Sequence, residues 1–220
     1  HTRLRTVTGV QTCALPICFW VTHYNDVTSV LTDSANFAVR SKRWHYHLND
    51  FGRDLRSQVP LLTAQAAGID ANARPVAEEI IGGFASRGSA DLAADFAALY
   101  PIMLLSRTIG IPDSDIAVFA DRYLRMQRGW RWHPTNQDSG KRAMRELVDY
   151  FTPLLDKRRS DPQGDWLSAF ATLEIDGPAT TAHDVVATLL EADHETLHGA
   201  LANMWMLLLT HPDQFEAVRG

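Results

Sequence analysis

One apolar pattern with helical spacing and no proline runs from residue 181 to residue 210, and it constrains the fold more than any other feature. Thr181 and Asp184 have the spacing of a capping box, which predicts a helix start. Apolar residues then recur for about seven turns: Val185, Leu189, Leu190, Leu197, Leu201, Met204 and Leu208. The pattern predicts one long helix in a mainly α-helical chain.

Charged and ionisable residues crowd the middle of this predicted helix. The longest apolar run, residues 204–209, is far too short to cross a membrane. Charge within an otherwise apolar helix indicates either a buried cavity, cofactor or metal that accepts these groups, or turns that face water. The residues in question are Glu191, Asp193, His194, Glu195 and His198.

Composition describes a soluble globular chain. Its 220 residues are 45% hydrophobic and 21% charged, and the formal net charge is −5. A negative chain has no general attraction to phosphate backbones or anionic lipid, so we expect no nucleic-acid and no membrane partner. We expect a soluble protein of the bacterial cytoplasm.

Cysteine occurs only at positions 13 and 18. Residues 19–220 therefore offer no thiol for a disulfide, a zinc–thiolate site or a nucleophile. The leader, residues 1–18, differs from everything downstream, and its VTGVQTCALPI stretch looks like a translated sequencing adapter. We expect residues 1–18 to lie outside the fold and residues 19–220 to form one domain.

The rest of the chain reads as short elements. Residues 19–22 predict a strand, and Asn25 or Asp26 the start of a short helix whose apolar face would be buried. Residues 38–72 predict mostly loop. Further helices are predicted near residues 50–59, from Pro75 to Gly88, from an Asp91 cap to Gly110, from Asp113 or Ser114 onward, and from about 141 to 158, followed by a surface turn to residue 165.

Two hypotheses explain the ionisable residues in the middle of the predicted helix. His194, Glu195 and His198 form an H-E-x-x-H sequence, in which two imidazoles one turn apart hold zinc and the glutamate activates water. Zinc needs a third protein ligand, for which Glu216 is the best candidate.

The second hypothesis comes from resemblance to a family. LLEADHETLHGALANMWMLLLTHPDQFEAVR resembles the long distal helix and following helix of bacterial cytochrome P-450 haem-thiolate monooxygenases. FWVTHYNDVTSVLTDSANF resembles the early strand and helix of that family, and ADLAADFAALYPIMLLSRTIGIPDSD a segment between them. Three matches in the expected order are more specific than one five-residue motif, and they account for most of the zinc signal.

The resemblance implies a truncated cytochrome P-450 fold with a small N-terminal β element and a long distal, oxygen-activating helix. It implies that Glu195 and Thr196 are catalytic and relay protons to oxygen. It places Ala192 and Asp193 against haem b, with Asp193 where the family usually has glycine. It assigns Leu189, Ala192 and Leu197 to the substrate pocket, and it assigns no metal ligand because the axial cysteine is absent.

The implied activity is insertion of one oxygen atom of O2 into a small organic substrate, with electrons from a ferredoxin or flavoprotein. The E-x-x-R helix and the cysteine loop of the family are missing. We therefore expect an amino-terminal half that is inactive alone and exposes helix faces meant for the remainder. The alternatives are a zinc hydrolase using His194, Glu195 and His198, or a helical interaction domain without catalysis.

Overall fold

A computed structural model describes residues 11–13, 18–37, 46, 51–129, 134–175, 177–192 and 194–219. The chain divides into two compact units, His1–Arg40 and Ser41–Gly220. Each unit is described by itself.

The first unit holds two short strands and one helix. β1 (Gln11–Cys13) pairs antiparallel with β2 (Cys18–Trp20), and α1 (Tyr24–Thr32) follows. Only two residues of the predicted strand at 19–22 lie in β2, and its partner β1 comes from the leader. A ladder of three residues does not establish the family's N-terminal β element, which stays a prediction.

The helix prediction near residue 25 is confirmed by α1, but its predicted buried face is wrong within the described part of this unit. No residue of α1 is buried, and the Leu31 side chain is 76% exposed. The helix starts at Tyr24 after His23, whose side chain makes no capping hydrogen bond.

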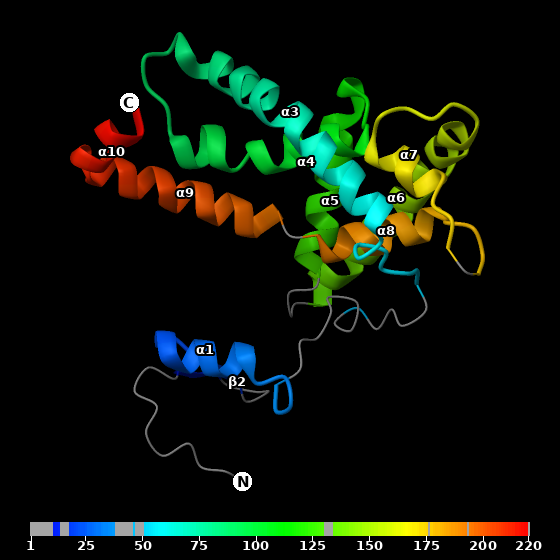
Figure 1. Cartoon of the computed structure of the whole chain (residues 1–220), viewed down its shortest axis with the longest axis horizontal. Coiled ribbons are helices and arrows are strands. Elements are labelled where there is room, and N and C mark those ends of the chain that lie inside the picture. The colour runs from blue at the N-terminus through cyan, green and yellow to red at the C-terminus, as the bar shows by residue number, and fades with distance from the viewer. Residues whose placement is uncertain are drawn as a thin grey trace. The chain divides into compact units, whose positions relative to one another are not determined.

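All the regular secondary structure among the described residues of the second unit is helical. In Figure 1, α3, α4 and α9 lie side by side, and α5, α6, α7 and α8 form the other group. The elements are α3 (Val59–Ala85), the π-helical turn η1 (Leu92–Ala97), α4 (Tyr100–Ile109), the 3₁₀ turn η2 (Asp113–Asp115), α5 (Ile116–Gly129), α6 (Pro134–Ser160), α7 (Trp166–Ala171), α8 (Ala182–Glu191), α9 (His194–Thr210) and α10 (Pro212–Arg219).

Two predicted helix ends are confirmed. The Asp91 carboxylate accepts hydrogen bonds from the backbone N–H groups of Ala93 and Ala94, at 3.0 and 3.1 Å. Gly110 ends α4 with a φ of 93°, a conformation that glycine adopts without steric cost. The predicted single helix between them is instead the turn η1 followed by α4.

Other predicted boundaries are wrong. α3 begins at Val59, so residues 59–72 are helical rather than loop, residues 51–58 are not helical, and Pro75 lies inside the helix. An interior proline removes one backbone hydrogen bond at a cost of about 3 kcal/mol. Burial of apolar side chains on both sides of it, Leu61 and Val76 among them, offsets that cost. α6 begins at Pro134, and α7 has no counterpart in the sequence prediction.

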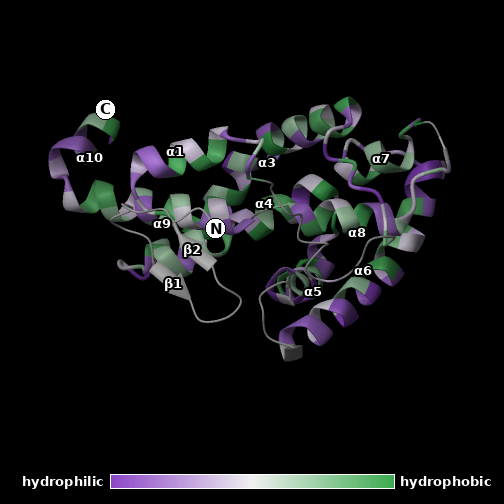
Figure 2. Ribbon diagram, turned by 90° about the horizontal axis from the view of Figure 1, so that it is seen from below, coloured by the Kyte–Doolittle hydropathy of each residue, from purple (hydrophilic) through white to green (hydrophobic). Residues whose placement is uncertain are grey.

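The apolar side chains form two clusters. The main core joins α5, α6, α7 and α8 around large buried rings such as Phe119, Phe151 and Trp166. Figure 2 shows purple and green alternating along α6, as expected of a helix with one polar and one apolar face. A smaller cluster of Val76, Ile80 and Phe96 packs against Leu201 and Trp205 of α9.

A buried tyrosine fills the close approach of α5 and α6. The Tyr46 hydroxyl donates a hydrogen bond to the carbonyl oxygen of Met126, and burial raises the pKa of that hydroxyl. A Cβ atom added at Gly129 or Gly140 would come within 1.9 or 2.1 Å of the same hydroxyl oxygen. The two glycines therefore permit the helices to meet around Tyr46.

We predict opposite effects for one substitution at two helical glycines. Gly140→Ala should lower the free energy of unfolding by about 1–3 kcal/mol, because the new methyl group overlaps the Tyr46 hydroxyl. Gly83→Ala on α3, where a Cβ meets nothing within 4 Å, should raise it by about 0.5–1 kcal/mol through helix propensity. Urea unfolding followed by circular dichroism measures both, and equal effects would contradict this packing.

Candidate functional site

The predicted long helix is interrupted at its charged turns. α8 ends at Glu191, Ala192 is extended with φ −67° and ψ 141°, and α9 begins at His194. Asp193 lies outside the described residues. The prediction of one continuous helix is therefore wrong, and we call this interruption the break.

A buried side chain from α5 occupies the last carbonyl groups of α8. The Gln127 side-chain nitrogen lies 2.9 Å from the Leu189 carbonyl oxygen, 3.1 Å from that of Leu190 and 3.1 Å from that of Ala192. Gln127 is only 2% exposed. The Leu189 oxygen also accepts from the Ala192 backbone N–H at 3.2 Å. The last carbonyls of a helix lack their usual i+4 donors, and this amide supplies donors in their place.

Two further side chains complete the same cap. The Arg56 guanidinium donates to the Glu191 carbonyl oxygen at 2.9 Å, and the Tyr123 hydroxyl donates to the Ala192 carbonyl oxygen at 3.3 Å. The Tyr123 ring also meets the His194 ring edge-on, with centroids 5.2 Å apart. Side chains from two separate segments, α5 and residues 51–58, thus converge on the break.

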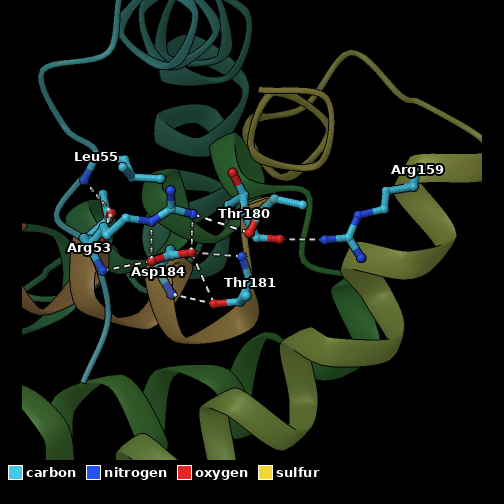
Figure 3. A network of polar contacts seen from close by, with 8 residues as sticks. Arg53, Leu55, Arg159, Thr180, Thr181 and Asp184 are labelled. Carbon is cyan, nitrogen blue, oxygen red and sulfur yellow. Dashed lines mark hydrogen bonds and ion pairs between the residues drawn. The ribbon is translucent and has the colours of Figure 1, made fainter. Parts of the chain in front are cut away.

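The start of α8 is fixed as the sequence predicts. The Thr181 hydroxyl accepts from the Asp184 backbone N–H, and the Asp184 carboxylate accepts from the Thr181 N–H, which confirms the capping box. The same carboxylate binds Arg53, which lies 131 positions earlier, through its backbone N–H at 2.7 Å and its guanidinium at 2.9 Å (Figure 3). Arg159 of α6 donates to the neighbouring Thr180 carbonyl oxygen.

The 51–58 segment follows α8 along its length. Arg53 binds Asp184 and, one helical turn on, the Leu55 backbone N–H donates to the Thr188 hydroxyl at 3.0 Å. Arg56 reaches the carbonyl of Glu191 one turn further. The partners on α8 recur every three or four residues, so one face of the helix is held from its capping box to the break.

Electrostatics at the capping box favour the ionised carboxylate. Burial alone would raise the pKa of Asp184, but hydrogen bonds from Arg53 and Thr181 outweigh it and lower the pKa to about 2. The same contacts raise the pKa of Arg53. The pair is therefore charged at neutral pH.

Two of the predicted substrate-pocket residues line a cavity beside the break. Ala192 and Leu197 border a space of about 220 Å³, with His194 and the Tyr123 ring, between α3, α4, α5 and α9. The third, Leu189, is fully buried in the main core and does not line it. Thr108 on α4 also borders the cavity, and its buried hydroxyl has no hydrogen-bond partner among the described residues.

The predicted catalytic pair stands in the first turn of α9. Glu195 is half-buried and Thr196 is exposed, directly after the break. The sequence prediction missed Gln127, Tyr123 as a polar partner, and Arg56. Both Tyr123 and Gln127 lie in the helix that the sequence predicts from Asp113 or Ser114 onward, and no local signal marks Gln127 as different from any other helical glutamine.

The zinc hypothesis is not favoured. Among the described residues, which leave out Asp193, no three His, Cys, Asp or Glu side chains gather in a way that could hold a metal ion. The proposed third ligand, Glu216, lies on α10, where it forms an ion pair with Arg219 at 3.6 Å.

Within the described residues, one stretch, Leu92–Ile109, is long and apolar enough to cross a membrane by length and composition alone. The mean hydropathy of this stretch is 1.3. The stretch comprises η1 and α4, and 44% of it is buried within the protein. The core helix of a soluble protein gives the same result.

The chain is similar in sequence to known bacterial proteins. The chain is 30% identical over 216 residues to the cyclomarin C epoxidase CymV of Salinispora arenicola, covering 86% of this chain and 54% of that protein. It is 33% identical over 160 residues to the cytochrome P-450 monooxygenase PikC of Streptomyces venezuelae, covering 67% of this chain and 36% of that protein. This confirms the resemblance to the cytochrome P-450s. The chain spans about half the length, or less, of these curated relatives.

Solved structures show the same fold. A cytochrome P-450-like monooxygenase of microbial secondary metabolism superimposes with a TM-score of 0.74 at 20% identity, covering 98% of this chain and 62% of that one. Ligand-free cytochrome P-450 TbtJ1 superimposes with a TM-score of 0.69 at 25% identity, covering 96% and 58%. No family model matches the chain.

The residues present do not make a complete haem site. The cavity beside Ala192, about 220 Å³, is smaller than the roughly 300–1,000 Å³ typical of small-molecule and cofactor sites. After residue 18 the sequence has no cysteine to act as an axial ligand. Haem is the cofactor that the P-450 relatives imply.

We predict that Asp184 makes the stability of the chain depend on acid pH. Because its pKa is lower in the folded state, its contribution of about 2 kcal/mol is present above pH 4 and is lost as the pH falls from about 4 to 2. Asp184→Asn should remove this part of the pH dependence, measured by urea unfolding between pH 7 and pH 2.

The control is Asp70→Asn, on the exposed surface of α3. It should leave the native pH dependence unchanged. An Asp184→Asn curve parallel to the native one at every pH would contradict the charged pair.

Proposed function

We propose that this chain is the oxygen-activating, amino-terminal half of a haem-dependent monooxygenase. The observation that carries the proposal is the break at Ala192, which interrupts the distal helix at the turn where the family resemblance puts oxygen chemistry. An interruption that three side chains hold in place is a built feature of the fold.

In this proposal residues 19–220 are one domain, residues 1–18 lie outside it, and the rest of the fold comes from polypeptide beyond this sequence. The exposed apolar side chains of α9 support it. Met204, Met206, Leu207 and Leu209 are between 40% and 61% exposed. Apolar surface on this scale marks a face that another part of a structure covers.

The proposed reaction inserts one oxygen atom of O2 into a small organic substrate, with electrons from a ferredoxin or flavoprotein. Bound haem b supplies the oxygen chemistry, and this chain alone is inactive because it has no axial thiolate. In our proposal, Ala192 and Asp193 face the haem, and Ala192 and Leu197 line the substrate pocket, whereas Leu189 belongs to the core behind it.

Two side chains of this chain move protons in the proposal. The half-buried Glu195 carboxylate takes a proton from water and passes it on, and the Thr196 hydroxyl accepts and donates within the same turn. Both stand next to the break, so their position depends on how Ala192 is held.

We predict that the longer reading frame binds haem through a thiolate. The DNA flanking codons 19 and 220 is recovered, the whole frame is expressed with a haem precursor, and the carbon monoxide difference spectrum of the reduced protein is recorded. The proposal predicts the red-shifted Soret band of a cysteine-ligated haem. A frame that encodes no downstream cysteine loop, or a protein that binds no haem, would contradict it.

In that protein, Glu195→Gln and Thr196→Val should each lower product formation by about a hundredfold, because a positioned acid or hydroxyl contributes at least that much to proton transfer. The spectrum should stay unchanged. Matched controls are Glu216→Gln on α10 and Thr63→Val on α3, both exposed, which should keep full activity. Equal activity in all four variants would exclude the proton relay.

A further inference from the structure

Neither proline nor glycine accounts for the break. Helix interruptions arise at proline, at glycine, at π-bulges, or where a side chain or water enters the backbone hydrogen-bond ladder. Residues 191–196 read Glu-Ala-Asp-His-Glu-Thr, with neither proline nor glycine. An inserted side chain is the cause that the structure offers.

Gln127 occupies the ladder at the required place. In an uninterrupted helix the carbonyl oxygens of residues 189–192 accept from the amides of residues 193–196. In the structure the Gln127 amide lies within 3.1 Å of three of these four oxygens, and Arg56 donates to the fourth. The side chains take the position that the next turn of helix would otherwise hold.

The end of α5 that carries Gln127 is closely packed. Gln127 lies in the last turn of α5, one residue after Met126, whose carbonyl accepts from the buried Tyr46 hydroxyl. Two residues further, Gly129 meets the same tyrosine at the close approach to α6. Gln127 is therefore presented by a tightly packed element, while α9 has no buried residue of its own.

We infer that Gln127 is a positioning residue, whose carboxamide enters the hydrogen-bond ladder of the distal helix, holds the break at Ala192 and thereby sets where Glu195 and Thr196 stand. The role of Gln127 in positioning catalytic residues rests on the proposed function. Its role in holding the break does not. Tyr123 is a secondary support, since it donates one longer hydrogen bond to the same carbonyl of Ala192.

The test separates hydrogen-bond donation from packing. Gln127→Met keeps the size of the side chain and removes both donors. Gln127→Glu also keeps the size, but it donates only while the carboxyl is protonated. Burial among carbonyl oxygens raises the pKa of such a glutamate above its usual value of about 4.3, so protonation is expected on going from about pH 8 to pH 5.

The readout is backbone amide exchange of residues 189–198, measured by mass spectrometry on the chain itself and compared with the native chain at the same pH. Gln127→Met should change exchange there by about tenfold or more at both pH values, since a lost hydrogen bond shifts a local equilibrium by that order. Gln127→Glu should match Gln127→Met at pH 8 and return toward the native rate at pH 5.

Nearby titrating groups are controlled by the same design. His194, Glu191, Arg56 and Tyr123 surround the break, and all are present in the native chain and in Gln127→Met at both pH values. Gln163→Met is the matched control, because the Gln163 side-chain amide donates to a loop carbonyl far from the break in sequence, that of Asp161, at 3.3 Å. It should leave residues 189–198 unchanged.

Two results would overturn the inference: native exchange at residues 189–198 in Gln127→Met, or Gln127→Glu behaving alike at pH 8 and pH 5. If Gln127→Met does not fold, the pH comparison of Gln127→Glu decides by itself. The exchange result is independent of haem binding by the longer protein, so failure of this inference and failure of the proposed function are distinguishable.

Discussion

The Gln127 side-chain amide lies within hydrogen-bond distance of three backbone carbonyl oxygens, those of Leu189, Leu190 and Ala192. The rest of the site depends on this interaction. A buried carbonyl without a partner costs free energy comparable to a lost hydrogen bond. A helix that stops inside a protein therefore needs donors from elsewhere, and α5 provides them. Our inference predicts that without these donors the helix would continue past residue 191, and that the turn carrying Glu195 and Thr196 would move.

The α8 helix is held at both ends and along one face. Its start is fixed by the capping box and by Arg53, its middle by the contact from Leu55 to Thr188, and its end by Gln127 and Arg56. α9 is held differently, through Leu201 and Trp205 on the smaller cluster of apolar residues. The fold thus combines a fixed helix before the break with a more exposed one after it, and the ionisable residues stand at the junction.

Local signals in the sequence predicted local structure well. The Thr181–Asp184 capping box, the Asp91 cap and the Gly110 helix end are confirmed, because each depends on residues a few positions apart. Long-range effects were invisible. Gln127 is 65 positions from Ala192, and Arg53 is 131 positions from Asp184, so neither of these two contacts has a local signature.

Long-range packing also explains where the structure differs from the sequence prediction in α3. Pro75 predicts a helix start by its local chemistry, yet apolar burial on both sides carries α3 through it. The family resemblance identified the fold and the relatives correctly because it combined three ordered segments, while the assignment of Glu195 and Thr196 stays a prediction. The exposure of α9 agrees with the expectation that its apolar face is meant for contacts outside this chain.

The most direct test of this account is the backbone conformation of the native chain across the break, from carbon chemical shifts and sequential amide contacts measured by NMR. The account predicts helical shifts through Glu191, an extended shift at Ala192 and helical shifts again from His194. Unbroken helical shifts and amide contacts from residue 189 to residue 196 would contradict it.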